Sequence, residues 1–346
     1  MAWLIDAKKQ CLVPAKAELQ YVALSYVWGQ AAMLRTERAN LLAHQNDRVF
    51  DRLRARDIYG SLCIVHEEGS KHTRIRDMAK IYENTRLTIV AGDGLDADHG
   101  LRGIPNVSQP RQLHPELELS DTISVRAPQN LALEETTWAR RGWTWQELQF
   151  SQRRLTFVDG SVRWRCAESF FCEDDVFPAR DYRKTTESIG DLNEPNLDNV
   201  CRSRVGVGAA SLTDLGKDIS TFNQRSLTYD EDALLAFEGT LAIYIEHQFP
   251  RGFLHGIPVS LLDSALLRHT QTTVPFAEVR QASSHSRECP PRWGWSGWKG
   301  KILQCWEGGL LGQDNVRPPQ QTISILTWKL RCSVTSTPVK IPFQND

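Results

Sequence analysis

The residues best suited to chemistry lie in one stretch, residues 138–151, which reads WARRGWTWQELQFS. It holds three of the chain's 11 tryptophans, two adjacent arginines and one carboxylate, Glu147. A helix that begins near Thr144 would place Trp143, Glu147 and Phe150 on one face. A carboxylate on an aromatic face is either locked by a partner or kept reactive by loss of solvent. Glu147 is therefore the first candidate for a catalytic residue.

Glu147 also has a structural explanation. Thr144 and Glu147 fit a capping box, with Thr144 as the N-cap and Glu147 binding back to the Thr144 amide. The neighbouring Arg140 and Arg141 offer ion-pair partners, and either could instead hold a phosphate-bearing ligand through paired hydrogen bonds. The sequence leaves the structural and the catalytic roles open.

A second group of candidates follows the apolar run at residues 21–26, which reads YVALSY. A short run rich in β-formers without clean alternation is typical of a strand buried on both faces. Ser25, Tyr26 and Trp28 fall at its C-terminal end, where ligands bind in open α/β sheets. Packing would explain the same residues. If they bind a ligand, we expect Glu147 to share their cleft.

The elements that would position these residues form an α/β pattern. Residues 61–65 and 87–91 read as further buried strands, and Ile75, Met78 and Tyr82 recur at the spacing of an amphipathic helix between them. We expect residues 21–26, 61–65 and 87–91 to be neighbouring parallel strands. The predicted fold is therefore a parallel sheet flanked by helices, over residues 1–175.

The rest of the chain predicts a second unit. Residues 176–210 are polar and without a period, which indicates a linker. Residues 211–346 mix helical and β patterns. A helix is expected around residues 234–244, after the acidic residues 230–232. The tryptophan cluster at residues 293–298 is expected to pack in the core of this unit.

Composition narrows the classes of function. The chain has 346 residues and a formal net charge of −1, so no global charge attracts nucleic acid or an anionic membrane. No apolar run is long enough to span a bilayer. Eight irregularly spaced cysteines and the absence of a secretory leader predict a reduced, cytoplasmic setting. The aspartates of residues 93–98 and the pair Cys166 and Cys172 fit no standard calcium or zinc spacing, so neither a metal nor a cofactor is expected.

Several blocks in order resemble fungal heterokaryon incompatibility (HET) domain proteins. The blocks cover roughly residues 3–306 and include YVALSYVWG at 21–29, LCI at 62–64, the helix and strand ending at Ala91, the Gly-Leu loop at 100–103, the stretch 138–151, RSLTYDEDALLAF at 225–237, GIP at 256–258 and PPRWGWSGWKG at 290–300. The resemblance implies an effector of fungal non-self recognition, a form of innate immunity. Such an effector triggers programmed cell death through association with a second copy or with a non-self recognition protein.

The resemblance also leaves an enzyme activity open. HET domains are similar to Toll/interleukin-1 receptor (TIR) domains, some of which cleave NAD. By that analogy Glu147 would be the catalytic glutamate, with NAD as substrate and not as cofactor. Ser25, Tyr26 and Arg141 would contact the ligand, and Trp28 or Trp143 would stack on its nicotinamide.

One departure from the family pattern supports a third interpretation. The family carries a helix and a strand before its Leu-Cys-Ile block, whereas residues 46–60 of this chain are too short for both. This short segment would be explained by a faulty gene model or by a decayed, inactive relative of the family.

Overall fold

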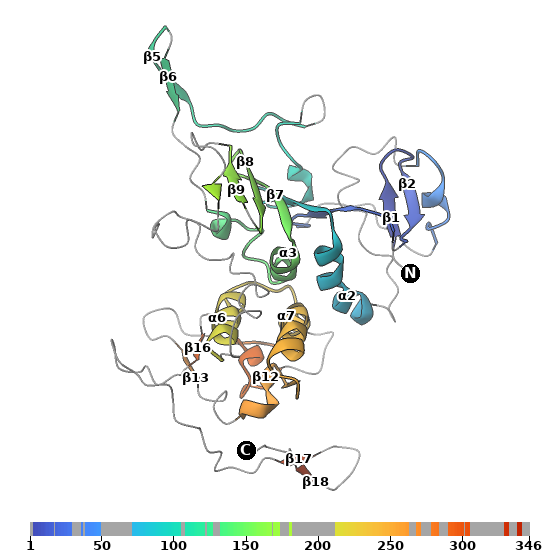
Figure 1. The fold of residues 1–346 in the computed structure, drawn as a ribbon, viewed down its shortest axis with the longest axis vertical. Helices are drawn as coiled ribbons and strands as arrows, with labels where there is room; N and C mark the ends of the chain where they lie inside the picture. The colour runs from blue at the N-terminus through green and yellow to red at the C-terminus, as the bar shows by residue number, and fades with distance from the viewer. Residues whose placement is uncertain are drawn as a thin grey trace. The chain divides into compact units, whose positions relative to one another are not determined.

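The computed structural model divides the chain into two compact units, Met1–Leu197 and Asp198–Asp346 (Figure 1). The boundary falls within the polar stretch 176–210. The structure describes residues 3–16, 18–29, 36, 39–49, 71–104, 108–121, 123–126, 132–167, 169–173, 180–181, 212–262, 268–270, 278–283, 290–300, 302–304, 329–331 and 338–340.

A six-stranded sheet organises the first unit, in the order β10-β9-β8-β7-β4-β3. The strands are β3 (Val22–Ser25), β4 (Leu87–Ala91), β7 (Arg153–Val158), β8 (Ser161–Cys166), β9 (Ser169–Cys172) and β10 (Arg180–Asp181). The strands β3, β4 and β7 run parallel, whereas β7 to β10 pair antiparallel. The fold is therefore mixed α/β, with a mixed sheet in place of the parallel sheet that the sequence predicted.

The strand β4 confirms one predicted pairing and excludes another. It pairs in parallel with β3 on one edge and with β7 on the other. A strand has only two edges, so none is left for residues 61–65, and the expectation that they pair with residues 87–91 is wrong. Residues 61–65 themselves lie outside the described residues.

Asp-Gly between two β-rich runs predicts a hairpin. The structure has this hairpin at Asp159 and Gly160, and it is the reason why the sheet is mixed. Both residues have positive φ, 53° and 70°, as the two central positions of a type I′ turn require. Asp93 supports the turn, because its carboxylate accepts hydrogen bonds from the backbone N–H of Asp159 and, at 3.3 Å, from that of Gly160. The turn sends β8 back alongside β7.

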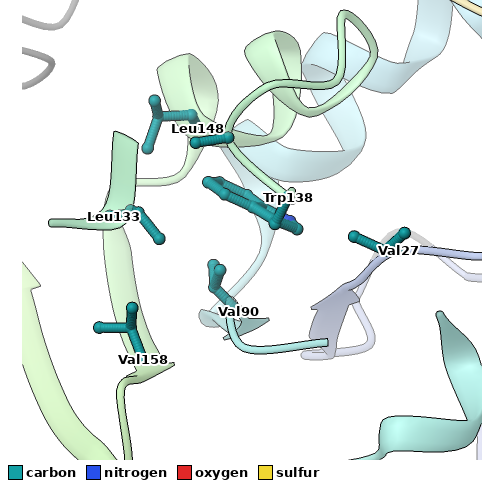
Figure 2. Close-up of a cluster of buried hydrophobic side chains, with 7 residues drawn as sticks. Val27, Val90, Leu133, Trp138, Leu148 and Val158 are labelled. Atoms are coloured by element: carbon teal, nitrogen blue, oxygen red, sulfur yellow. The ribbon is translucent and has the colours of Figure 1, made fainter. Parts of the chain in front are cut away.

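Among the residues that the structure describes, two helices accompany the sheet. The predicted amphipathic helix is α2 (Lys71–Asn84), and α3 (Thr144–Phe150) contacts it. Because successive side chains of a strand point to opposite faces, β4 and β7 supply two separate apolar clusters. Trp138, which precedes α3, and Leu148 of α3 join Val90 and Val158 on one face. Figure 2 shows the Trp138 ring among Val27, Val90, Leu133 and Leu148.

The opposite face of the sheet is covered by the loop that follows β4. Its cluster is made of Tyr26, Ala91, Ala97 and Leu101, with Leu24, Ile89, Ile104 and Phe157 packed against them. The remaining short elements of this unit are β1 (Trp3–Asp6), β2 (Cys11–Pro14), η1 (Ala43–Gln45), η3 (Ala97–His99), β5 (Glu116–Ser120), β6 (Ile123–Arg126) and η4 (Leu133–Glu135).

In the described part of the second unit, two helices pack against one tryptophan of the predicted cluster, Trp295, whereas Trp293 is exposed. Trp295 is buried, with its ring edge-on to Phe222 and Phe237 at centroid distances of 6.0 and 5.2 Å, which confirms its place in the core. The expected helix at 234–244 is α7. The elements are α6 (Leu212–Asn223), η5 (Asp230–Asp232), α7 (Ala233–His247), β11 (Phe253–Leu254), β12 (Ile257–Pro258), η6 (Val259–Leu261), β13 (Arg268–Thr270), β14 (Glu278–Val279), η7 (Trp295–Gly297), β15 (Trp298–Lys299), β16 (Ile302–Gln304), β17 (Lys329–Arg331) and β18 (Pro338–Lys340).

A buried ion pair in the second unit joins Arg280 to Asp230. The Arg280 guanidinium, whose side chain is 1% exposed, lies 3.2 Å from Asp230. It also donates to the side-chain oxygen of Asn223 and to the carbonyl of Trp298, at 2.9 Å each. Across the described part of both units, none of the helices has the length and apolar character that a bilayer crossing requires.

Candidate functional site

Glu147 stands out within α3 because it is the one residue of that helix that is not buried. Its carboxylate accepts a short hydrogen bond from the hydroxyl of Ser25, the last residue of β3. The two residues are 122 positions apart in the sequence. The structure therefore brings together the two segments that the sequence singled out.

The Ser25 hydroxyl has a second partner, the indole of Trp138. The indole Nε1–H donates to Ser25 Oγ at 2.7 Å, and both residues are fully buried. An indole N–H can only donate, and an ionised carboxylate can only accept. The hydrogen bonds therefore run in one direction, from Trp138 through Ser25 to Glu147. These three residues are called the Trp138–Ser25–Glu147 chain below.

This chain lies at the C-terminal ends of the parallel strands. Ser25 ends β3 and pairs with Val90, the penultimate residue of β4. Ligands of open α/β sheets bind at this end of the strands. The predicted proximity of Glu147 to Ser25 is thus confirmed, whereas the catalytic role of Glu147 stays a prediction.

The C-terminal end of α3 is held by side chains of the sheet. The last carbonyls of a helix lack partners within it. The Ser151 hydroxyl lies 2.5 Å from the carbonyl of Glu147 and 2.7 Å from the Thr88 hydroxyl on β4. The buried Arg154 of β7 donates to the carbonyl of Leu148 at 2.9 Å. The seven-residue helix α3 is therefore fixed to the sheet through the carbonyls of Glu147 and Leu148.

The N-terminal end of α3 differs from the predicted capping box. Trp143, not Thr144, is the N-cap, and no side chain caps the helix. The Thr144 hydroxyl lies instead 2.7 Å from the carbonyl of Trp138 and 2.8 Å from that of Arg141. Thr144 thus ties down the turn before the helix, and the Glu147 carboxylate is engaged with Ser25.

The other predicted ligand residues occupy different places. Tyr26 packs in the cluster on the opposite face of the sheet from Glu147. Trp28 is 36% exposed, and its carbonyl accepts from the N–H of Ala97 at 3.3 Å. Arg141 and Trp143 are partly exposed and immediately precede α3. Sequence reasoning gave no role to Trp138, although a buried serine at a strand end needs hydrogen-bond partners and an indole N–H is a donor.

The aspartates of the loop after β4 serve the backbone. Asp93 supports the turn between β7 and β8, and Asp96 accepts from the N–H of Asp98 at 3.0 Å. His99 lies in the same loop. Burial lowers the pKa of His99, and the charge of Arg102 lowers it further. These hydrogen bonds give Asp93 and Asp96 a structural role in the loop and the adjacent turn.

A comparison with known protein families identifies the first unit. Residues 21–147 match the family described as heterokaryon incompatibility protein (HET). The match includes all three members of the Trp138–Ser25–Glu147 chain. No curated protein and no solved structure matches this sequence. The part of the chain from Tyr21, before β3, to Glu147 in α3 therefore matches a HET domain.

Proposed function

We propose that this protein is a heterokaryon incompatibility effector whose HET domain triggers cell death when it associates with a partner. The family match over residues 21–147 carries the proposal, because it indicates a role related to heterokaryon incompatibility. The partner would be a second copy of the chain or a non-self recognition protein, and the association would take place in the cytoplasm.

Expression in a fungal host tests this proposal. The full-length chain, induced from a regulated promoter, should stop growth and make cells permeable to a vital dye. Two differently tagged copies, expressed together, test the homotypic form of the association by co-purification. Cells that accumulate intact protein and still grow at the rate of the empty-vector strain would refute the effector function.

A second candidate function is cleavage of the nicotinamide–ribose bond of NAD. Its support is the partly exposed Glu147, which is fixed by Ser25 at the strand ends where ligands bind. In this reaction the bond from ribose C1′ to the nicotinamide nitrogen breaks, and its electron pair leaves with nicotinamide. Glu147 stabilises the cationic ribosyl centre, and water adds to C1′ and loses a proton. Trp28 or Trp143 would stack on the nicotinamide, and Arg141 would hold a phosphate.

Purified protein and one matched pair of variants test this function. Glu147→Gln should keep the fold, because the amide fills the same volume, and should lower NAD turnover by on the order of 10²–10³-fold. Glu135→Gln makes the same change at an exposed glutamate of η4 and should leave turnover unchanged. Parent protein that consumes no NAD would refute the function. Glu147→Gln protein that works at the parent rate would refute only the role of Glu147.

The remaining alternative is that this protein is an inactive relative of the family. The observation behind it is the short segment 46–60. The three paired parallel strands and the buried Ser25 and Trp138 support an intact site instead. Sequencing the transcript across residues 46–62 tests the gene model. An additional coding segment there would show that the short segment is a gene-model fault.

A further inference from the structure

We infer that Ser25 and Trp138 are positioning residues for the Glu147 carboxylate, acting through the Trp138–Ser25–Glu147 chain. The inference rests on the proposed NAD-cleaving function of Glu147. It adds two buried residues that would touch no substrate and would act by fixing the group that does.

The first argument is the direction of the hydrogen bonds. A serine hydroxyl has one proton and two lone pairs, so it can rotate to suit its surroundings. Here the Trp138 indole donates to Ser25 Oγ at 2.7 Å and occupies one acceptor position. The single hydroxyl proton is then directed at Glu147 Oε2, which accepts it. This arrangement suits the ionised carboxylate, because a charged acceptor strengthens the bond.

The second argument is rigidity. Ser25 is held by the backbone pairing of β3 with β4, and it is 0% exposed. The Trp138 ring is also 0% exposed and is enclosed by Val27, Val90 and Leu148 (Figure 2). Neither side chain can change rotamer without disturbing a packed core. Of the three residues, only Glu147 is partly exposed. The hydrogen bond from Ser25 therefore ties a partly exposed carboxylate to side chains that are fixed in the core.

The consequence for a reaction is geometric. Catalytic groups must be held within about 0.5 Å of their productive position by locked neighbours. Without the Ser25 hydroxyl, the Glu147 carboxylate loses the contact that directs it. The helix α3 is still held by the contacts of Ser151, Thr88 and Arg154, and β3 is still held by its pairing with β4. The loss should therefore appear in the chemical step and not in substrate binding.

Ser25→Ala is the direct variant, and Ser161→Ala is its matched control. Ser161 is 1% exposed and begins β8 of the same sheet, so the same atom is removed at equal burial. We expect Ser25→Ala to lower the kcat for NAD by on the order of 10²-fold with KM nearly unchanged. Ser161→Ala should change neither constant. In a Glu147→Gln background, Ser25→Ala should have no further effect.

A spectroscopic measurement tests the hydrogen-bonded chain without turnover. In ¹⁵N-labelled full-length protein, the Trp138 indole N–H signal is assigned by its loss in Trp138→Phe. It should shift in Ser25→Ala and also in Glu147→Gln, because the Ser25 hydroxyl then loses its charged acceptor. Glu147→Gln keeps this test available even if Ser25→Ala does not fold. The signal should stay in place in Ser161→Ala.

The outcomes separate this inference from the function on which it rests. A Trp138 signal that does not move in Glu147→Gln overturns the inference, whatever the protein does to NAD. A parent protein with NAD turnover and a Ser25→Ala variant with unchanged kcat also overturns it. A moving signal in a protein without NAD turnover overturns the NAD function, and the chain is then a structural tie instead of a positioning device. A moving signal together with the selective loss of kcat supports both.

Discussion

Substitution of Gly29 by alanine should destabilise the first unit strongly, and the structure allows the cost to be worked out. Gly29 follows Trp28 in the loop after β3 and has φ +62°. The left-handed conformation costs an alanine about 1–2 kcal/mol. A Cβ at Gly29 would also lie 2.3 Å from Asp96 Cβ and 2.9 Å from Asp96 Cα. Because the second atom is backbone, the loop after β4 must move, which adds about 1–3 kcal/mol of overpacking.

The same movement breaks a hydrogen bond. The N–H of Ala97 donates to the carbonyl of Trp28 at 3.3 Å and joins the loop after β4 to the end of β3. The free energy of unfolding of the first unit should therefore fall by about 2–5 kcal/mol in Gly29→Ala. Gly100→Ala is the control, because Gly100 has φ +63° and nothing within 4 Å of its added Cβ. It should lose only the conformational part, about 1–3 kcal/mol, because its ψ of −170° lies in a region that is essentially restricted to glycine.

Hydrogen exchange read by mass spectrometry separates the two units. Protection of the β4 amides reports the first unit, and protection of the α7 amides reports the second. Gly29→Ala should lower protection in β4 more than Gly100→Ala does, with α7 unchanged in both. If the two variants lose equal protection in β4, the clash with Asp96 contributes nothing and the reasoning fails.

Two further predictions concern buried charge. Arg280→Met should lower the free energy of unfolding of the second unit by about 3–5 kcal/mol, seen as lost protection of the α7 amides, because Asp230 and Asn223 lose their buried partner. In the first unit, burial lowers the pKa of His44 and of His99 below the ordinary value of 6.5. The unfolded chain then binds more protons than the folded one as the pH drops below 6.5, so the stability of this unit should fall there. In His99→Asn the protection of β4 should depend less steeply on pH.

The fold was predictable where its signals are local. The strands at 21–26 and 87–91, the helix α2, the hairpin at Asp159 and Gly160, and the helix α7 follow from apolar periodicity and turn chemistry within short windows. The order of the sheet was not predictable in this way. It depends on β7 pairing with β4 across a long stretch of intervening chain, and no local pattern marks which strands become neighbours.

The site was predictable in outline but not in its hydrogen bonds. The strand-end rule correctly placed Glu147 near Ser25. The capping box failed because Thr144 and Glu147 have both local and distant partners available. Their spacing in the sequence favoured a contact between Thr144 and Glu147. In the folded chain, Glu147 instead accepts a hydrogen bond from Ser25, and the Thr144 hydroxyl contacts the carbonyl of Trp138. Trp138 was overlooked because its role exists only once β3 and the turn before α3 are packed together.

The mixed sheet has a consequence for the order of folding. The strands β7, β8 and β9 are joined by short connections and can pair as soon as they are synthesised, since closing a short loop costs little entropy. By contrast, β3 pairs with β4 from a distant part of the sequence, Val22 opposite Leu87. The first strand of the sheet to leave the ribosome must therefore wait for its partners. Until β3 docks, Ser25 cannot reach Glu147, so a nascent chain or a fragment that lacks β3 leaves the Glu147 carboxylate without its contact to Ser25.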